Sequence, residues 1–137
     1  MVIQMKWTRI DVKTSSRTQL IEITDRISEE VKKSGIQDGV CHVYVQHTTA
    51  GLTINENADP DVVRDILTGL TRLVPATGDY RHAEGNSDAH IKASLMGFSL
   101  NVPLIDGRLA LGTWQGIYFC EFDGSRIRHV LVGITGE

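Results

Sequence analysis

A twelve-residue segment in the middle of the chain, Tyr80 to Ile91 (YRHAEGNSDAHI), carries side chains that can do chemistry and few that can pack a core. His82 and His90 stand eight residues apart, with Glu84 and Asp88 between them. Neutral imidazole and carboxylate groups are suitable ligands for zinc or another divalent metal. The spacing matches no compact zinc motif, so a metal site here needs a further ligand from elsewhere in the fold.

The alternative for this segment is a solvated loop in which Asn86 and Asp88 form a turn and a helix cap. The segment by itself does not decide between the two. Lys92 favours a site, because a cation in the first turn of a helix gains nothing from the helix dipole. Its position is easier to explain if it meets the phosphate of a ligand beside the free N–H groups of the helix start, although a solvated lysine remains the alternative.

A second polar segment, HTTAGLTINENADPD (residues 47–61), follows an apolar strand. His47 continues the face of that strand that carries Cys41, Val43 and Val45, so it can reach from the edge of a core into a pocket. A turn followed by a helix cap at Asp59 explains part of this segment. It leaves His47 and Glu56 without a role, and His47 is the candidate third ligand.

The remaining histidines, His42 and His129, lie within strand-like runs, and we interpret both as structural or partly exposed. Between two glycines, Thr113 and Gln115 in GTWQG form either a ligand-binding turn or a β-bulge, since glycine permits close backbone approach.

The elements that must position these residues follow from periodicity and turn signals. Strands are expected at residues 6–13, 19–23, 39–48, 52–56, 98–105, 108–112, 116–122 and 126–134, with a small turn at 49–51. Helices are expected at residues 25–34, 60–73 and 89–96. Hairpin turns are expected at Asp106-Gly107 and Asp123-Gly124.

Caps and stops sharpen the helix predictions. Thr24 or Asp25 should cap the first helix and Gly35 should end it. Asp59-Pro60 is a strong start for the second, whose apolar stripe extends to Leu73. The third should be capped by Asp88 and closed by Gly97. Early helices and a strand-rich second half predict an α+β domain with sheets packed on each other, spanning residues 1–137.

Composition limits the function classes. Apolar residues make up 41% of the 137 residues and charged residues 23%, which is typical of a globular domain. The net charge of −3 argues against a nucleic-acid or anionic-membrane partner. We expect no membrane span and no signal peptide. Cys41 and Cys120 sit in apolar runs and form no C-x-x-C pair, which fits a reduced, cytoplasmic protein.

Three long stretches together resemble the YjbQ family, also called secondary thiamine-phosphate synthase-like proteins. They are HTTAGLTINENADPDV, GNSDAHIKASLMG and GRLALGTWQGIYFCEFDGSR, and the resemblance covers essentially the whole chain. It implies a mixed β-sandwich with flanking helices, a homotrimer with polar pockets near subunit boundaries, and a weak thiamine-phosphate synthase activity. That reaction joins a pyrimidine methyl diphosphate to a thiazole phosphate and releases pyrophosphate.

Carried over onto this sequence, the resemblance implies a pocket contributed by all three stretches. Its residues are His47, Thr48, Asn55, Glu56, Asp59, His82, Asn86, Asp88, His90, Lys92, Thr113 and Gln115.

The hypothesis that follows is a site for a phosphorylated small molecule with a divalent metal. His47, His82 and His90 are the expected ligands, with Asp88 or Glu84 as substitutes. Three histidines favour zinc or another transition metal, while Mg²⁺ would enter with the substrate's phosphates.

Within this hypothesis Lys92 and Thr48 would hold phosphate, and Glu56 is the candidate acid–base. Two alternatives remain open: a metal-assisted phosphoesterase, and a non-catalytic trimer that binds a phosphorylated metabolite.

Overall fold

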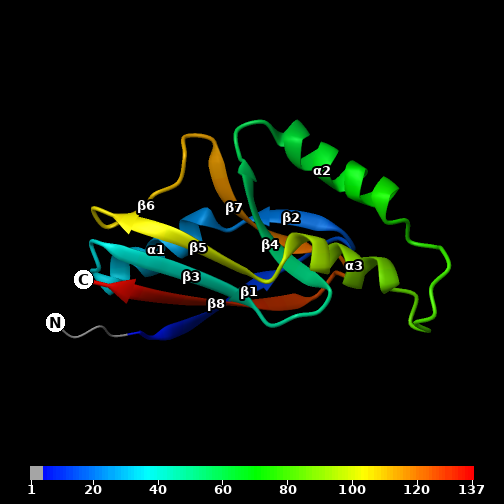
Figure 1. Cartoon of the computed structure of the whole chain (residues 1–137), viewed down its shortest axis with the longest axis horizontal. Coiled ribbons are helices and arrows are strands. Elements are labelled where there is room, and N and C mark those ends of the chain that lie inside the picture. The colour runs from blue at the N-terminus through cyan, green and yellow to red at the C-terminus, as the bar shows by residue number, and fades with distance from the viewer. Residues whose placement is uncertain (1–4) are drawn as a thin grey trace.

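The structure is a computed structural model that describes residues 5–137. It contains eleven elements in this part of the chain (Figure 1). In chain order they are β1 Trp7–Lys13, β2 Gln19–Glu22, α1 Thr24–Ser34, β3 Gly39–Val45, β4 Ala50–Glu56, α2 Pro60–Leu73, α3 Ser87–Met96, β5 Ser99–Ile105, β6 Arg108–Leu109, β7 Gln115–Glu121 and β8 Ile127–Gly136.

The strands form two sheets, and every strand pairing found in the described residues is antiparallel. One sheet has the order β1-β8-β3-β5-β6 and the other the order β2-β7-β4. The predicted α+β class, with sheets and flanking helices, is confirmed.

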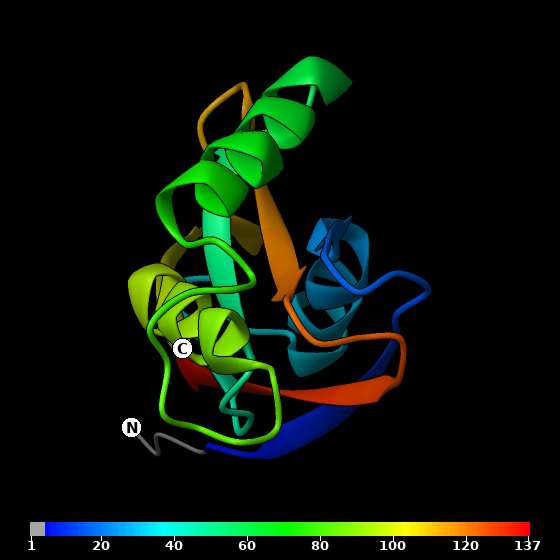
Figure 2. The ribbon, with the colours of Figure 1, turned by 90° about the vertical axis from the view of Figure 1, so that its right-hand side faces the viewer.

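The three-stranded sheet lies between two apolar clusters, which explains the continuous apolar run of β7. Ile117 and Phe119 face the five-stranded sheet and α1, in the larger cluster. Tyr118 and Cys120 face the other way, in a cluster with residues of α2 and α3. A strand buried on both faces loses the alternating pattern of a half-exposed strand. In Figure 2, α2 lies at the top, far from β1 and β8 at the bottom.

The hairpin prediction at Asp106-Gly107 is confirmed, and the one at Asp123-Gly124 is wrong. Ile105 pairs with Arg108 across a turn in which Asp106 has φ 52° and Gly107 has φ 74°. By contrast, β7 and β8 belong to different sheets, so the segment between them crosses from one sheet to the other. A turn signal marks a reversal of the chain but does not determine which strands then pair.

The same distinction applies between β3 and β4, where a turn was expected at residues 49–51. Ala50 and Gly51 belong to β4 instead, and β3 and β4 also lie in different sheets. Gly51 permits this course, because a Cβ there would lie 2.6 Å from the carbonyl oxygen of Gly97 at the end of α3.

Two predicted caps are wrong. The cap position of α1 is Ile23, and the Thr24 hydroxyl donates to Glu22 and accepts from the N–H of Ile117. The cap position of α3 is Asn86, so Asp88 lies in the first turn. The predicted ends at Gly35 and Gly97 are confirmed.

Helix α2 begins as predicted, with the Asp59 side chain accepting from the Asp61 N–H at 2.9 Å and Pro60 in the first turn. The predicted stripe is wrong at Leu73, which is 77% exposed because α2 ends there and Val74 turns inward instead.

Candidate functional site

His47 lies two residues beyond the end of β3, next to β8 of the five-stranded sheet. β3 ends at Val45, so the backbone N–H of His129 on β8 has no strand partner on that side. The Nε2 atom of His47 accepts this N–H at 2.9 Å, and the two imidazole rings stack with centroids 5.9 Å apart. Burial and the Arg128 charge lower the pKa of His47, which favours the neutral ring that such an acceptor requires.

This contact bears on the predicted metal role of His47. A nitrogen that accepts a backbone proton has no free lone pair for a metal ion. Ligation through Nδ1 would leave the proton on Nε2, facing the N–H of His129. In this arrangement His47 completes the strand ladder, and Thr48 beside it is exposed.

His82 and His90 are brought together at the N-terminal end of α3. Their rings meet edge to face with centroids 5.3 Å apart, and the Nε2 of His82 lies 3.7 Å from the Glu84 carboxylate. The side chain of His82 is 45% exposed and that of Glu84 is 73% exposed. His82 is therefore accessible to a ligand from solvent, and His90 is partly exposed beside it.

Asp88 and Lys92 are buried one helical turn apart on α3. The Asp88 carboxylate accepts two hydrogen bonds from Arg17, at 2.9 and 3.0 Å, and one from Lys92 at 3.1 Å. Hydrogen bonding to Arg17, reinforced by Lys92, lowers the pKa of Asp88 to about 2 despite its burial. Both groups are thus used inside the protein, and Arg17, with a side chain 42% exposed, is the cation of this ion-pair cluster that reaches solvent.

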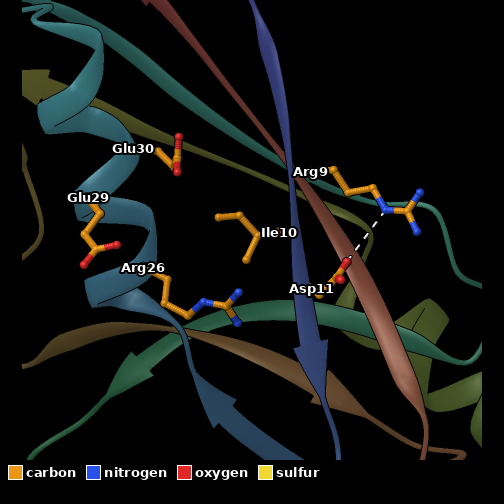
Figure 3. Close-up of a pocket in the computed structure, with 6 residues that line it drawn as sticks. All are labelled: Arg9, Ile10, Asp11, Arg26, Glu29 and Glu30. Atoms are coloured by element: carbon orange, nitrogen blue, oxygen red, sulfur yellow. Dashed lines mark ion pairs between the residues drawn. The ribbon is translucent and has the colours of Figure 1, made fainter.

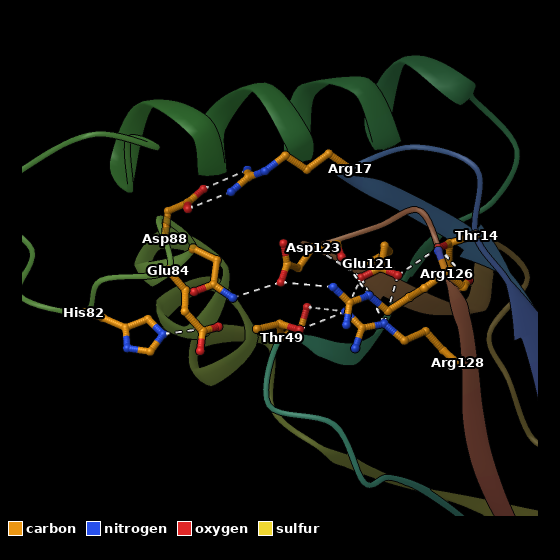
Figure 4. A network of polar contacts seen from close by, with 11 residues as sticks. Thr14, Arg17, Thr49, His82, Glu84, Asp88, Glu121, Asp123, Arg126 and Arg128 are labelled. Carbon is orange, nitrogen blue, oxygen red and sulfur yellow. Dashed lines mark hydrogen bonds and ion pairs between the residues drawn. The ribbon is translucent and has the colours of Figure 1, made fainter.

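A second buried network joins three segments that connect the two sheets, those between β1 and β2, between β3 and β4, and between β7 and β8 (Figure 4). Arg128 of β8 donates to the Glu121 carboxylate of β7 at 2.9 Å and to the hydroxyl of Thr49 at 2.8 Å. The Thr14 hydroxyl also donates to Glu121. Burial alone would raise the pKa of Glu121, but the hydrogen bonds from Arg128, Asp123 and Thr14 lower it overall.

The segment between β7 and β8 connects this network to α3. Asn86 donates through Nδ2 to the Asp123 carboxylate at 2.9 Å, and Arg126 lies 3.3 Å from the same carboxylate oxygen. The Oδ1 atom of Asn86 is buried and has no hydrogen-bond partner among residues 5–137. The start of α3, Arg17, Asp123 and Arg126 therefore form one polar region, which we call the α3 site.

The other predicted residues lie at the opposite end of β4. Glu56 pairs with Gln115 of β7 in the strand ladder, whereas Ala50 pairs with Glu121. These two ends are separated by six residues of strand, about 20 Å. The far group consists of Asn55, Glu56, Asp59, Thr113 and Gln115.

The side chains of this far group mostly serve their own loops. Gln115 accepts from the N–H of Gly112 at 2.8 Å, and Asn55 accepts from the N–H of Glu56 at 2.7 Å. A single chain therefore does not gather all the predicted residues around one pocket.

No three side chains of the types His, Cys, Asp and Glu within residues 5–137 are grouped so that they could hold one metal ion. His82, His90 and Glu84 come nearest to such a group among the predicted ligands, and their two imidazoles are donors that transition metals accept. In the same part of the chain, no helix is long and apolar enough to cross a membrane.

Two hollows of the surface lie away from these residues. They have volumes of about 560 Å³ each, lie along β1 and α1 and share Glu30. Arg9, Ile10 and Asp11 line the first from β1, and α1 forms its opposite wall (Figure 3). Neither hollow is lined by a predicted site residue.

Sequence reasoning missed most of the charged residues around α3. These are Arg17, Glu121, Asp123, Arg126 and Arg128. A signal was present in IYFCEFDGSRIRH (residues 117–129), where a glutamate interrupts an apolar strand and two arginines follow within seven residues. A buried carboxylate is rarely found without a partner, so Glu121 predicts a nearby cation.

The protein is therefore an α+β protein in which two antiparallel sheets pack on each other, with a cluster of charged residues where the chain passes between the sheets. The family model for UPF0047 protein YjbQ-like matches residues 8–137, and the chain belongs to this family. A UPF0047 protein of Methanocaldococcus jannaschii is 49% identical over 137 residues, which cover 100% of this chain and 99% of that protein. The UPF0047 protein YugU of Bacillus subtilis is 47% identical, over 93% and 97% of the two chains.

Solved structures agree with the fold. A YjbQ/UPF0047 protein of Clostridium acetobutylicum, described as uncharacterized, superposes with a TM-score of 0.91 at 57% identity, over 93% of this chain and 98% of that one. A YbjQ-like protein of unknown function from Sulfolobus solfataricus gives a TM-score of 0.95 at 34% identity, over 99% and 100% of the chains.

Proposed function

We propose that this protein is an enzyme that acts on a phosphorylated small molecule, with a weak thiamine-phosphate synthase activity. The observation that carries the proposal is the α3 site. Arg17 and Arg126, with side chains 42% and 51% exposed, lie on segments that meet the start of α3. The side chain of Asn86, at the cap position, makes no hydrogen bond to the N–H groups of its first turn. Guanidinium groups and a helix N-terminus together favour phosphate.

In the proposed reaction, the thiazole nitrogen attacks the methylene carbon of the pyrimidine methyl diphosphate. The carbon–oxygen bond to the diphosphate breaks, and pyrophosphate leaves with the electron pair. Arg17 and Arg126 would stabilise the charge that develops on the leaving group. Removing one stabilising group of this kind typically lowers the rate by about 10²–10³.

The buried residues of the site have a positioning role in this proposal. Lys92 and Asp88 hold Arg17 in place rather than touching the ligand themselves. Glu56, the earlier candidate acid–base, lies at the far end of β4 with its side chain partly exposed. Glu56 can act on a ligand bound at the α3 site only if that Glu56 belongs to a neighbouring subunit whose β4 end lies beside the site. The homotrimer that the family resemblance implies would supply such neighbours, and it remains part of the proposal.

The proposed metal ligands are His82 and His90. Water, a phosphate oxygen, Glu84 or a neighbouring subunit would complete the coordination. A transition-metal ion held there would supply a Lewis acid for phosphate oxygens. Mg²⁺ that arrives with the substrate's phosphates is the alternative.

Elemental analysis of untagged protein tests the metal. Near-stoichiometric metal should be present in the wild type and in His47→Ala, and it should be lost in His90→Ala. Equal metal content in all three proteins, or none in any after dialysis against several ions, would refute the two-histidine site.

Turnover of the two thiamine precursors with added Mg²⁺ tests the activity. We expect Arg17→Met to lower the rate by about 10²-fold. Arg108→Met, which removes an exposed arginine of β6 outside the site, is the control and should leave the rate unchanged. Hydrolysis of phosphate esters without a second substrate would instead favour the metal-assisted phosphoesterase. Absence of turnover, together with a rise in melting temperature from one phosphorylated ligand, would favour the non-catalytic binding protein.

The proposed compartment is the cytoplasm. Cys41 and Cys120 are both buried and unpaired, and burial raises the pKa of their thiols to about 11 and about 12. Such cysteines suit a reducing compartment.

A further inference from the structure

Strand β1 leaves one long edge of the five-stranded sheet without a partner among the described residues. β1 has seven residues and pairs only with β8, whereas β6 at the opposite edge has two residues. Proteins usually protect long edges with charged side chains, proline, a bulge or a covering segment, because an unpaired edge is a template for another strand. β1 carries charges of both signs, at Arg9, Asp11 and Lys13. β1 contains no proline, and its pairing with β8 is continuous from Trp7 to Lys13.

The hydrogen-bonding groups that face the free edge can be assigned. The N–H of Thr14 donates to Arg126 on the β8 side, and the N–H of His129 points away from β1 toward His47. The direction of the backbone N–H and C=O groups alternates from residue to residue along a strand. The N–H and C=O groups of the even-numbered residues of β1 therefore point toward β8. The N–H and C=O groups of the odd-numbered residues face outward. These residues are Trp7, Arg9, Asp11 and Lys13.

We propose that two copies of the chain join through antiparallel pairing of β1 with the partner's β1, about a two-fold axis at Ile10. The sequence WTRIDVK is self-complementary in this register. Arg9 lies opposite the partner's Asp11, and Trp7 lies opposite the partner's Lys13. Opposite charges and a cation beside an aromatic ring both stabilise such cross-strand pairs.

The hydrogen-bond phase and the charges select this register together. Only pairings of odd-numbered residues with odd-numbered residues align the outward N–H and C=O groups. A shift by one step in one direction places Arg9 opposite the partner's Arg9. A shift in the other direction places Asp11 opposite the partner's Asp11. Like charges directly opposite each other are destabilising, so both neighbouring registers are disfavoured.

The hollow beside β1 gives the partner strand room. It has a volume of about 560 Å³ and separates β1 from Arg26, Glu29 and Glu30 of α1 (Figure 3). Ile10 lines it and is 8% exposed. The partner's Ile10 would enter this hollow from the inner face of the sheet and cover the exposed rim of Ile10.

Disulfide trapping tests the register. In an antiparallel ladder, directly opposite residues without mutual hydrogen bonds have Cα atoms about 4.5 Å apart, within the range of a disulfide. Ile10→Cys should therefore form a disulfide-linked dimer under mild oxidation, and the buried Cys41 and Cys120 should not interfere. Thr8→Cys is the matched control, because the two Thr8 residues would lie about 13 Å apart along the strands. Failure of Ile10→Cys to cross-link, or equal cross-linking of Thr8→Cys, would overturn the proposal.

Charge reversal tests the contacts in solution. Light scattering should give the wild type an even number of chains, and Arg9→Glu should halve the mass. The double variant Arg9→Glu/Asp11→Arg should restore it, because the exchange recreates the opposite-charge pair. His129→Ala is the control, since His129 contacts both Arg9 and Asp11 without facing the partner strand. Circular dichroism must show that each variant is folded.

The outcome is separable from the proposed homotrimer. Six chains that fall to three in Arg9→Glu would support both proposals. Three chains in the wild type would overturn the β1 pairing and leave the trimer standing, and a monomer would overturn both.

Discussion

Replacing Asp88 with asparagine removes one charge from the buried ion-pair cluster and keeps the shape of the side chain. The wild-type carboxylate is fully buried and accepts from Arg17 and Lys92. Asp88→Asn leaves Lys92, itself 2% exposed, without a counter-charge. Breaking a buried pair by removing one partner typically costs about 3–5 kcal/mol, so we expect the free energy of unfolding to fall by about 3 kcal/mol near pH 7.

The pH dependence gives the prediction its signature. The pKa of Asp88 is about 2 in the folded protein, against about 3.9 in an unfolded chain. A carboxyl whose folded pKa is lowered contributes stability that is fully present above the unfolded pKa and is lost as pH falls toward the folded pKa. The difference corresponds to about 3 kcal/mol, lost progressively as the pH falls from about 5 through the folded pKa of about 2. The gap between wild type and Asp88→Asn should narrow over that window.

Urea unfolding followed by circular dichroism at several pH values measures both effects. The double variant Asp88→Asn/Lys92→Met is the matched control, because it removes the orphaned charge and should recover most of the lost stability. A loss below about 0.5 kcal/mol, the usual range for an exposed site, would refute the buried ion-pair interpretation. So would a gap between wild type and Asp88→Asn that stays constant down to pH 2.

Three further predictions concern the stability of variants, two of them comparing a buried residue with an exposed one nearby and one removing a single hydrogen bond. Arg128→Met should lower the free energy of unfolding by about 3 kcal/mol or more, because it leaves the buried Glu121 carboxylate without its cation. Arg126→Met, at a side chain that is 51% exposed, should change the free energy of unfolding by at most about 1 kcal/mol. Equal effects of the two variants in urea titrations would contradict this prediction. His47→Ala should lower the free energy of unfolding by about 1–2 kcal/mol, because the N–H of His129 loses its acceptor. In the wild type, NMR titration of the ring protons should show the pKa of His47 below its ordinary value. An ordinary pKa would argue against the stacked, partly buried ring. Leu70→Ala should lower the free energy of unfolding by about 2–5 kcal/mol, while Leu73→Ala, at a residue that is 77% exposed, should change it by no more than about 0.5 kcal/mol. Thermal melts in which Leu73→Ala is the less stable variant would contradict this assignment of the buried face of α2.

Local signals predicted the elements well because each depends on neighbours in the chain. Alternation predicts a half-exposed strand, and Asp59-Pro60 predicts a helix start whatever the rest of the fold does. The signal at Asp123-Gly124 failed for the opposite reason. Which sheet a strand joins after a turn is decided by residues far away, in this case β1 and β3 on either side of β8.

The site was predicted by residue type and could be assembled only in space. His82 and His90 come together because one loop returns to its own helix, which short-range reasoning can reach. Arg17 and Asp88 are 71 residues apart, and nothing in the local sequence of either indicates the other. Polarity alone also cannot separate a ligand-binding lysine from a buried one such as Lys92.

The position of β8 has a consequence for synthesis of the chain. β8 follows β1 and β3 in the chain, and it lies between them, pairing Trp7 with Gly133 and Val43 with Val132. Contacts between such distant residues slow folding, because a long loop must close before they form. β1 therefore emerges from the ribosome without its neighbour and must wait until β8 has been made. The five-stranded sheet can be completed only after β8 has been synthesised, and a nascent chain that stops before Ile127 leaves β1 and β3 with no strand to join them.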